Sequence, residues 1–288
     1  MARMMQYLPP ARVGREAPVA ATLAGWIRRA FDGWCARLMD RSMAISRFLD
    51  CRIEAVALAW LAVFSLAALP RLLLPQTPVV GIDGLVRHVL PYALIALAPI
   101  AGFLVAAGSF PRGILNEQPH IRLALWGRWR KLSVLEARQN PAYGPRGFVV
   151  SLLVGMLLNV VVRTLEFLAS MPAMGSLAPE WGNRLFMATA ADVIVMNFFY
   201  VVCFVMALRS VPLFPRMLVL AWGIDIMMQL TIWHVATGTP GVPLAVSSAL
   251  MNLLQGNITK VMISAVVWLP YLLLSERINV TYRNRVPG

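Results

Sequence analysis

Six runs of about twenty mostly apolar residues constrain the fold of this chain more than any other feature. A run of that length crosses the hydrocarbon core of a bilayer as one α-helix, which rises about 1.5 Å per residue. The runs are residues 55–74, 89–107, 148–168, 185–208, 217–236 and 258–274. Hydrophobic residues form 59% of the 288 residues and charged residues 14%, which excludes an ordinary soluble globule and a disordered chain. We therefore expect an all-α integral membrane protein with six transmembrane helices.

The formal net charge of +13 is interpreted here as a topology signal. Twenty-one of the 26 Lys and Arg residues flank the six runs on one side, and the opposite loops hold three, Arg71, Arg87 and Arg184. Because basic residues collect on the cytoplasmic side, both termini are expected there, in contact with anionic lipid. The charge therefore predicts no nucleic-acid partner. The Arg-rich first fifty residues lack the apolar core of a cleavable signal peptide, so the first run should remain as an anchor.

Two segments outside the runs, residues 23–38 and 121–135, have apolar residues at helical spacing opposite a basic face. Such helices lie in the headgroup layer, so we expect amphipathic interfacial helices on the cytoplasmic side. The residues expected to contact the membrane or a partner are Arg28, Arg29, Arg37, Arg128, Arg130 and Lys131. Residues 121–135 could equally form a solvated basic helix that packs on the protein's own bundle and contacts no partner.

These features divide the chain into four parts. Residues 1–52 form a basic cytoplasmic or interfacial segment, 53–110 a two-span unit, 111–142 a basic cytoplasmic loop, and 143–288 a four-helix membrane module.

The sequence contains no motif of a metal site, a cofactor site or a known catalytic site. Cys35, Cys51 and Cys203 are widely separated and have no His nearby, so no metal or disulfide framework is expected. His88 and His120 fall in predicted loops, with no acid or nucleophile at a spacing that indicates a catalytic site. We expect no cofactor and no enzymatic activity.

Five ionisable residues fall inside the apolar runs, where a charge costs several kcal/mol and often serves a function. They are Arg163, Glu166, Asp192, Asp225 and Lys260. Counting about 1.5 Å per residue puts all of them except Asp225 in the outer half of the bilayer. Lys260 is expected within one turn of the outer end of the sixth helix, with Asn257 in the headgroup zone.

Helical spacing groups these residues with other polar side chains. Asn159 shares a face with Arg163 and Glu166, and Gln229 shares one with Asp225. If these faces point inward, helices three to six enclose a polar core that opens outward.

A second interpretation of the same residues is open. Arg163 and Glu166 stand three apart and can pair with each other while reaching the outer interface, as Lys260 also can, so all three fit ordinary anchors. Asp192 fits either role. Asp225 fits an anchor least, because a short carboxylate at mid-depth must be paired, protonated or next to water.

The C-terminal sequence resembles a known family. The residues that carry this resemblance are Trp268, Pro270, Tyr271, Ser275, Arg277 and Thr281. They resemble the Trp-x-Pro-Tyr and Ser-x-Arg-Ile-x-x-Thr ending of the domain-of-unknown-function 2569 family of four-span bacterial inner-membrane proteins. Gly144 and Gly147 resemble the Gly-rich turn before that family's first span, and Phe214 with Pro215 its Phe-Pro after the second.

The resemblance covers residues 143–285 and implies a four-helix membrane module without assigning an activity. The chain departs from the family at Phe148, where Trp is usual, and in its additional N-terminal half.

Two function hypotheses follow. The first is a non-enzymatic accessory, assembly or scaffolding subunit of a bacterial inner-membrane complex, docked on a membrane-protein partner through the basic segments. The alternative is a small transporter, with proton coupling as one form of it, built around the intramembrane polar cluster. A membrane enzyme acting on lipid or quinone has the least support.

Overall fold

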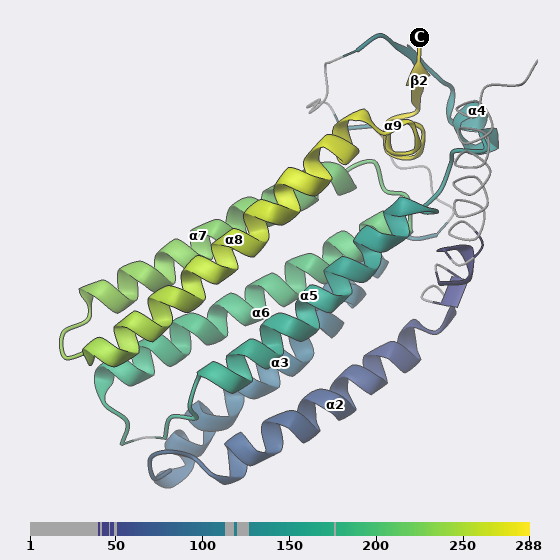
Figure 1. Cartoon of the computed structure of the whole chain (residues 1–288). Coiled ribbons are helices and arrows are strands. Elements are labelled where there is room, and N and C mark those ends of the chain that lie inside the picture. Colours follow the sequence, from purple (N-terminus) through teal and green to yellow (C-terminus); the bar gives the residue numbers. More distant parts are fainter. Residues whose placement is uncertain are drawn as a thin grey trace, which may run out of the picture. The chain divides into compact units, whose positions relative to one another are not determined.

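A computed structural model of the chain describes residues 40, 42–45, 47–48, 51–112, 118–119, 127–175 and 177–288 (Figure 1). The chain forms two compact units, Met1–Arg41 and Ser42–Gly288, and the second contains nearly all of the described residues. The predicted helix at 23–38, with Arg28, Arg29 and Arg37, lies outside the described residues, as do Cys35 and His120.

Six long apolar helices dominate the second unit, which confirms an all-α membrane protein. They are α2 (Ile53–Leu73), α3 (Gly81–Ser109), α5 (Phe148–Ser170), α6 (Glu180–Leu208), α7 (Phe214–Gly238) and α8 (Leu244–Leu274). Each is long and apolar enough to cross a bilayer. Successive helices alternate in direction, so the start of α2 and the end of α8 lie at the same end of the bundle (Figure 1).

Helix α6 is the centre of the bundle and the most buried of the six spans. It packs against α3, α5 and α7, while α8 packs on α7 and α2 on α3. The approach of α3 to α6 needs a glycine, because a Cβ at Gly102 would lie 2.7 Å from the carbonyl oxygen of Phe198. The outer helices α2 and α8 are the least buried, as expected for helices that face lipid.

Helix α8 begins at Leu244, well before the predicted start at residue 258. Polar residues dilute the apolar character of this first part, so a hydropathy window misses it. Its apolar residues nevertheless recur at helical spacing, and Leu250 and Leu254 are buried against Leu185 of α6 and Ile232 of α7. Packing against neighbouring helices therefore extends α8 beyond its most apolar part.

Helix α3 also begins early, at Gly81, and this corrects the prediction that His88 lies in a loop. His88 is buried within the helix. Its ring nitrogens lie 3.3 Å from the carbonyl oxygen of Met174 and 3.2 Å from that of Leu72. The histidine thus joins three segments at one end of the bundle.

The remaining elements gather at the opposite end, which we call the α9 end after its longest member. They are β1 (Trp129–Lys131), α4 (Val134–Gln139), α9 (Glu276–Arg283) and β2 (Arg285–Pro287). The two strands pair antiparallel. Ser133 and Glu136 form a capping box at the start of α4, and the amide hydrogen bond from Ser133 holds the pKa of the Glu136 carboxyl below its usual range.

The helix predicted over 121–135 is therefore wrong for residues 127–133 of its described part, while residues 134 and 135 begin α4. Residues 129–131 form a strand because the C-terminal segment supplies a pairing partner, and the Arg285 guanidinium lies 4.8 Å from the centre of the Trp129 ring. Arg128, Arg130 and Lys131 are exposed on and beside this strand.

Helix α9 packs its apolar face into the end of the bundle. Tyr282 is fully buried, its hydroxyl donates to the carbonyl oxygen of Ala207 at 2.9 Å, and burial raises its pKa. The Thr281 hydroxyl accepts a hydrogen bond from the Gly144 amide at 3.0 Å. Arg277 donates to the carbonyl oxygen of Ala142 at 3.2 Å. Two residues of the family-like ending therefore hold α9 against the turn that precedes α5.

Candidate functional site

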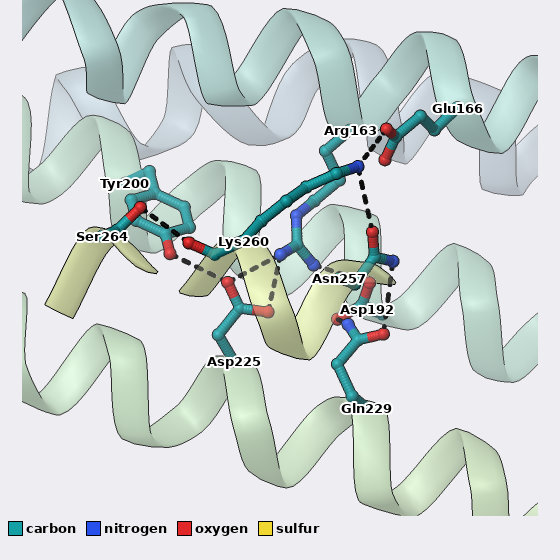
Figure 2. Close-up of polar contacts among 9 residues, drawn as sticks. All are labelled: Arg163, Glu166, Asp192, Tyr200, Asp225, Gln229, Asn257, Lys260 and Ser264. Carbon is teal, nitrogen blue, oxygen red and sulfur yellow. Dashed lines mark hydrogen bonds and ion pairs between the residues drawn. The ribbon is translucent and has the colours of Figure 1, made fainter. Parts of the chain in front are cut away.

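A single arginine on α5 binds carboxylates from two other helices. Arg163 donates from Nη1 to Oδ2 of Asp192 on α6 at 2.7 Å, and from Nη2 to both carboxylate oxygens of Asp225 on α7 at 2.6 Å (Figure 2). All three residues are buried. We call Arg163, Asp192 and Asp225 the triad.

Neutral polar side chains continue the triad in two directions. The Tyr200 hydroxyl of α6 donates to Asp225 at 2.8 Å. In the other direction, Gln229 donates to Asp192 at 3.2 Å, and Asn257 of α8 donates to the Gln229 amide oxygen at 3.3 Å. Each buried charge of the triad therefore has hydrogen-bond partners on at least one neighbouring helix, as buried ions require.

The network ends at an ion pair between Lys260 of α8 and Glu166 of α5. Lys260 also donates to the amide oxygen of Asn257 at 3.3 Å. This pair is more open than the triad, because the Lys260 side chain is 52% exposed and that of Glu166 is 32% exposed. Figure 2 shows the long Lys260 side chain reaching toward Glu166 past Arg163. A continuous hydrogen-bonded path therefore runs from the centre of the bundle to its surface.

Two predicted positions on α8 are corrected by this geometry. Lys260 lies about 24 Å along the helix from Leu244, not within a turn of its end. Asn257, predicted in the headgroup zone just before the sixth apolar run, lies within α8 and is bonded to Gln229 in the polar network. Both differences follow from the early start of α8.

The arginine does not pair with the acid three residues away. Arg163 points to Asp192 and Asp225, and Glu166 points to Lys260, so Arg163 is not an interfacial anchor. Burial explains why Arg163 pairs with Asp192 and Asp225, because two carboxylates deep in the bundle need a cation. Among the described residues, no other basic side chain is ion-paired to either carboxylate.

The triad contains one more acid than base. With both carboxylates ionised, it carries one net negative charge in a region of low dielectric. Lys260 and Glu166 balance each other and do not change this excess. One additional proton would make the whole network neutral.

A groove of about 280 Å³ lies beside the network, between α5 and α8. The polar residues that line it are Asn159, Arg163, Glu166, Tyr200, Asn257, Lys260 and Ser264. Asn159 thus lies one turn from Arg163 in the groove wall.

An aromatic cluster joins the two walls of the groove toward the α9 end. The Phe148 ring at the start of α5 lies 5.4 Å from that of Trp268 and 5.6 Å from that of Tyr271 on α8. Pro270 is between these two aromatic residues, and α8 continues through it to Leu274. Ser275 follows as the N-cap position of α9.

A second groove of about 280 Å³ lies between α2, α3, α5 and α6. Its lining is almost entirely apolar and includes Trp60, Phe64 and Phe103. It therefore offers hydrocarbon contacts and no charge.

Tyr200 is not among the site residues predicted from the sequence. Its signal was available, because a tyrosine in the middle of an apolar helix needs a partner for its hydroxyl. The hydrogen bond from Asn197 to Thr164, 2.9 Å long, was also missed. The predicted polar residues of α5, α6, α7 and α8 otherwise gather at one place, while Arg128, Arg130 and Lys131 lie away from it at the α9 end.

Within the described ranges, no three His, Cys, Asp or Glu side chains gather as a metal site would require. No family model, curated protein or solved structure matches the chain. The resemblance of residues 143–285 to a four-span family stays a prediction.

Proposed function

We propose that this protein is a proton-coupled membrane carrier and that the triad is its coupling site. The observation that carries the proposal is the sharing of one buried guanidinium by carboxylates from two other helices. Ionisable groups within membrane spans are rare and costly, and they mark ion and proton pathways, so they are functional-site candidates by default. Tyr200 lines the groove beside the triad and donates to Asp225, so its hydroxyl offers a group that can pass a proton to that carboxylate.

The mechanism that we propose couples protonation to helix packing. A proton on Asp192 or Asp225 removes the excess negative charge and weakens that residue's bond to Arg163. Because the bond links α5 to α6 or to α7, its weakening lets one helix move relative to the others. Such a two-state element is what a carrier needs to expose its site to the two sides in turn.

The location belongs to the same proposal. We propose a bacterial inner membrane because residues 143–285 resemble a family of that location, and we propose both termini and the α9 end in the cytoplasm because of the distribution of Lys and Arg. Residues 143–285 would form the module that resembles the four-span family. A carrier of this kind performs no covalent chemistry, so no enzymatic role is proposed.

The test is a transport phenotype in a strain that lacks the gene, scored over a panel of metabolites and toxic compounds. We expect wild-type protein to restore the phenotype and Asp225→Asn to reduce it at least tenfold at normal abundance. Asp83→Asn is the matched control, because Asp83 pairs with Arg87 on an exposed helix face. If Asp225→Asn restores transport as well as wild type does, the coupling role is wrong. If its abundance falls, Tyr200→Phe, which leaves every charge in place, takes its place in the same assay.

An accessory or scaffolding subunit is the second candidate, and the exposed basic group Arg128, Arg130 and Lys131 favours it. The β1–β2 pairing holds these residues at the α9 end, where they could contact a membrane-protein partner or anionic lipid. Purification in mild detergent, a salt wash and mass spectrometry would identify a stoichiometric partner. Replacing the three residues by Gln should then release it.

A further inference from the structure

The groove between α5 and α8 opens on the side of the bundle. Its lining extends along α5 from Leu152 to Glu166 and along α8 from Asn257 to Trp268. These stretches follow the long axes of two candidate membrane spans, so the groove runs parallel to the helices. Its mouth therefore faces the surroundings of the helices, which are lipid in a membrane.

The groove is narrowed at one end by aromatic rings. Phe148 of α5 contacts both Trp268 and Tyr271 of α8, which brings the two walls together there. A ligand that enters past this cluster would have to separate three rings. Entry from the side, past Lys260, requires the displacement of one partly exposed side chain.

The groove lining combines polar and apolar side chains. Arg163 and Tyr200 are buried in it beside apolar residues such as Leu218, and Lys260 is partly exposed. Leu158 and Val162 line the same groove and are 58% and 37% exposed. A molecule with a polar head and a hydrocarbon tail satisfies both kinds of side chain, because the head can reach Lys260 and Arg163 while the tail follows Leu158 and Val162 into the bilayer.

Two cations reach the groove, Arg163 and Lys260, and Glu166 is the one acid in its lining. Asp192 and Asp225 bind Arg163 without lining the groove, so the five ionisable residues together carry one net negative charge. The proposed proton on the triad removes that charge, and an anionic head then pairs with Lys260 in the protonated state. Lys260 is half exposed on a flexible side chain and can exchange Glu166 for a ligand anion without a change in any helix. Asn257 and Ser264 add hydrogen-bonding groups beside it.

We propose that this groove binds a bilayer-borne amphiphile with one anionic headgroup, which enters laterally and pairs with Lys260 over Arg163. A fatty-acid carboxylate and the phosphate of a phosphatidic acid share this chemistry. The inference rests on the proposed function in that it names the carrier's substrate class.

The experiment uses the purified full chain in nanodiscs of phosphatidylcholine. Photoactivatable fatty acid and photoactivatable phosphatidic acid are added separately, and the cross-linked peptides are identified by mass spectrometry. We expect at least one anionic probe to label peptides of α5 or α8, and unlabelled competitor of the same class to abolish the label. The probe that labels at the lower concentration identifies the source of the anion.

A glycine in the groove wall allows the site to be blocked. A Cβ at Gly155 would meet nothing within 4 Å, so Gly155→Leu should fold and place its side chain in the groove. Gly223 of α7 is equally open but does not line the groove, which makes Gly223→Leu the matched control. We expect labelling to fall at least tenfold in Gly155→Leu and in Lys260→Gln, and to stay at the wild-type level in Gly223→Leu.

Three results would overturn the proposal: undiminished labelling of Gly155→Leu, equal labelling of α5 and α8 by a zwitterionic phosphatidylcholine probe, or labelling confined to α2 and α3 beside the apolar groove. Should Gly155→Leu fail to fold, Ser264→Leu takes its place with the same expected loss. The labelling assay tests the amphiphile separately from the proposed function, because labelling needs no transport. If the probes label the groove but Asp225→Asn still restores the transport phenotype, the coupling site is wrong and the amphiphile stands. If Asp225→Asn loses the phenotype but no probe labels the groove, the amphiphile is wrong and the coupling site stands.

Discussion

Arg163 holds both carboxylate oxygens of Asp225 at 2.6 Å, although 62 residues of chain separate the two. The same guanidinium holds Asp192 at 2.7 Å, so the packing of α5, α6 and α7 depends on one charged side chain. Because the triad is buried, the free-energy cost of a substitution depends on which of its charges are removed. Removing the whole triad costs little if its volume is filled, whereas removing Arg163 alone leaves two carboxylates without a cation in a low dielectric.

We therefore expect Arg163→Met to destabilise the protein by about 3–5 kcal/mol, because it leaves two carboxylates buried without a cation. The measurement is the amount of monodisperse protein in detergent after heating, followed by fluorescence-detected size exclusion. Arg184→Met is the control, since Arg184 forms an exposed pair with Glu180 on the same helix face.

The triple variant Arg163→Met, Asp192→Asn, Asp225→Asn tests whether unpaired charge causes the loss of stability in Arg163→Met. With no charge left to compensate, most of the lost thermal stability should return. If the triple variant is as unstable as Arg163→Met, the loss arises from packing and not from unpaired charge.

The second ion pair should behave differently. Lys260 and Glu166 are partly exposed, so Lys260→Gln should change stability by no more than about 1 kcal/mol. The same heating assay measures it, with Arg163→Met as the reference for a large loss. A loss as large as that of Arg163→Met would mean that Lys260 is a structural part of the network and is not free to exchange partners.

Which residues meet in the site was partly predictable from the sequence. Hydropathy located the charged residues, and helical spacing put Asn159 and Gln229 on the correct faces. Neither signal says which helices are neighbours, and the pairing of Arg163 follows from the central position of α6. The i,i+3 alternative with Glu166 was locally reasonable, but burial of Asp192 and Asp225 gave the arginine stronger partners.

Two predictions from the sequence are wrong for the same physical reason. The segment containing Trp129 has helical spacing of apolar residues, yet it pairs with Pro287 at the far end of the chain. The first part of α8 is too polar for a hydropathy window, yet Leu250 packs it against neighbouring helices. In both cases long-range contacts outweigh the local pattern.

The buried hydroxyl of Tyr282 should stabilise the α9 end. Tyr282→Phe removes its hydrogen bond to the Ala207 carbonyl and should cost about 1 kcal/mol, seen as a lower thermal midpoint in detergent. Tyr92→Phe is the matched control, because the Tyr92 hydroxyl is also buried but has no hydrogen-bond partner among the described residues. That variant should be as stable as wild type or more so. Equal losses in the two variants would show that the Ala207 bond contributes nothing measurable.

Native cysteines offer a test of orientation. Cys51, just before α2, is exposed, and Cys203 in α6 is buried. In a Cys35→Ser background, a membrane-impermeant maleimide should label Cys51 in inside-out vesicles and not in right-side-out ones, because the positive-inside rule puts this end in the cytoplasm. Cys51→Ser in the same background should abolish the label, since burial protects Cys203. Labelling confined to right-side-out vesicles would reverse the orientation of all six helices and place the α9 end, with its exposed Arg and Lys residues, outside.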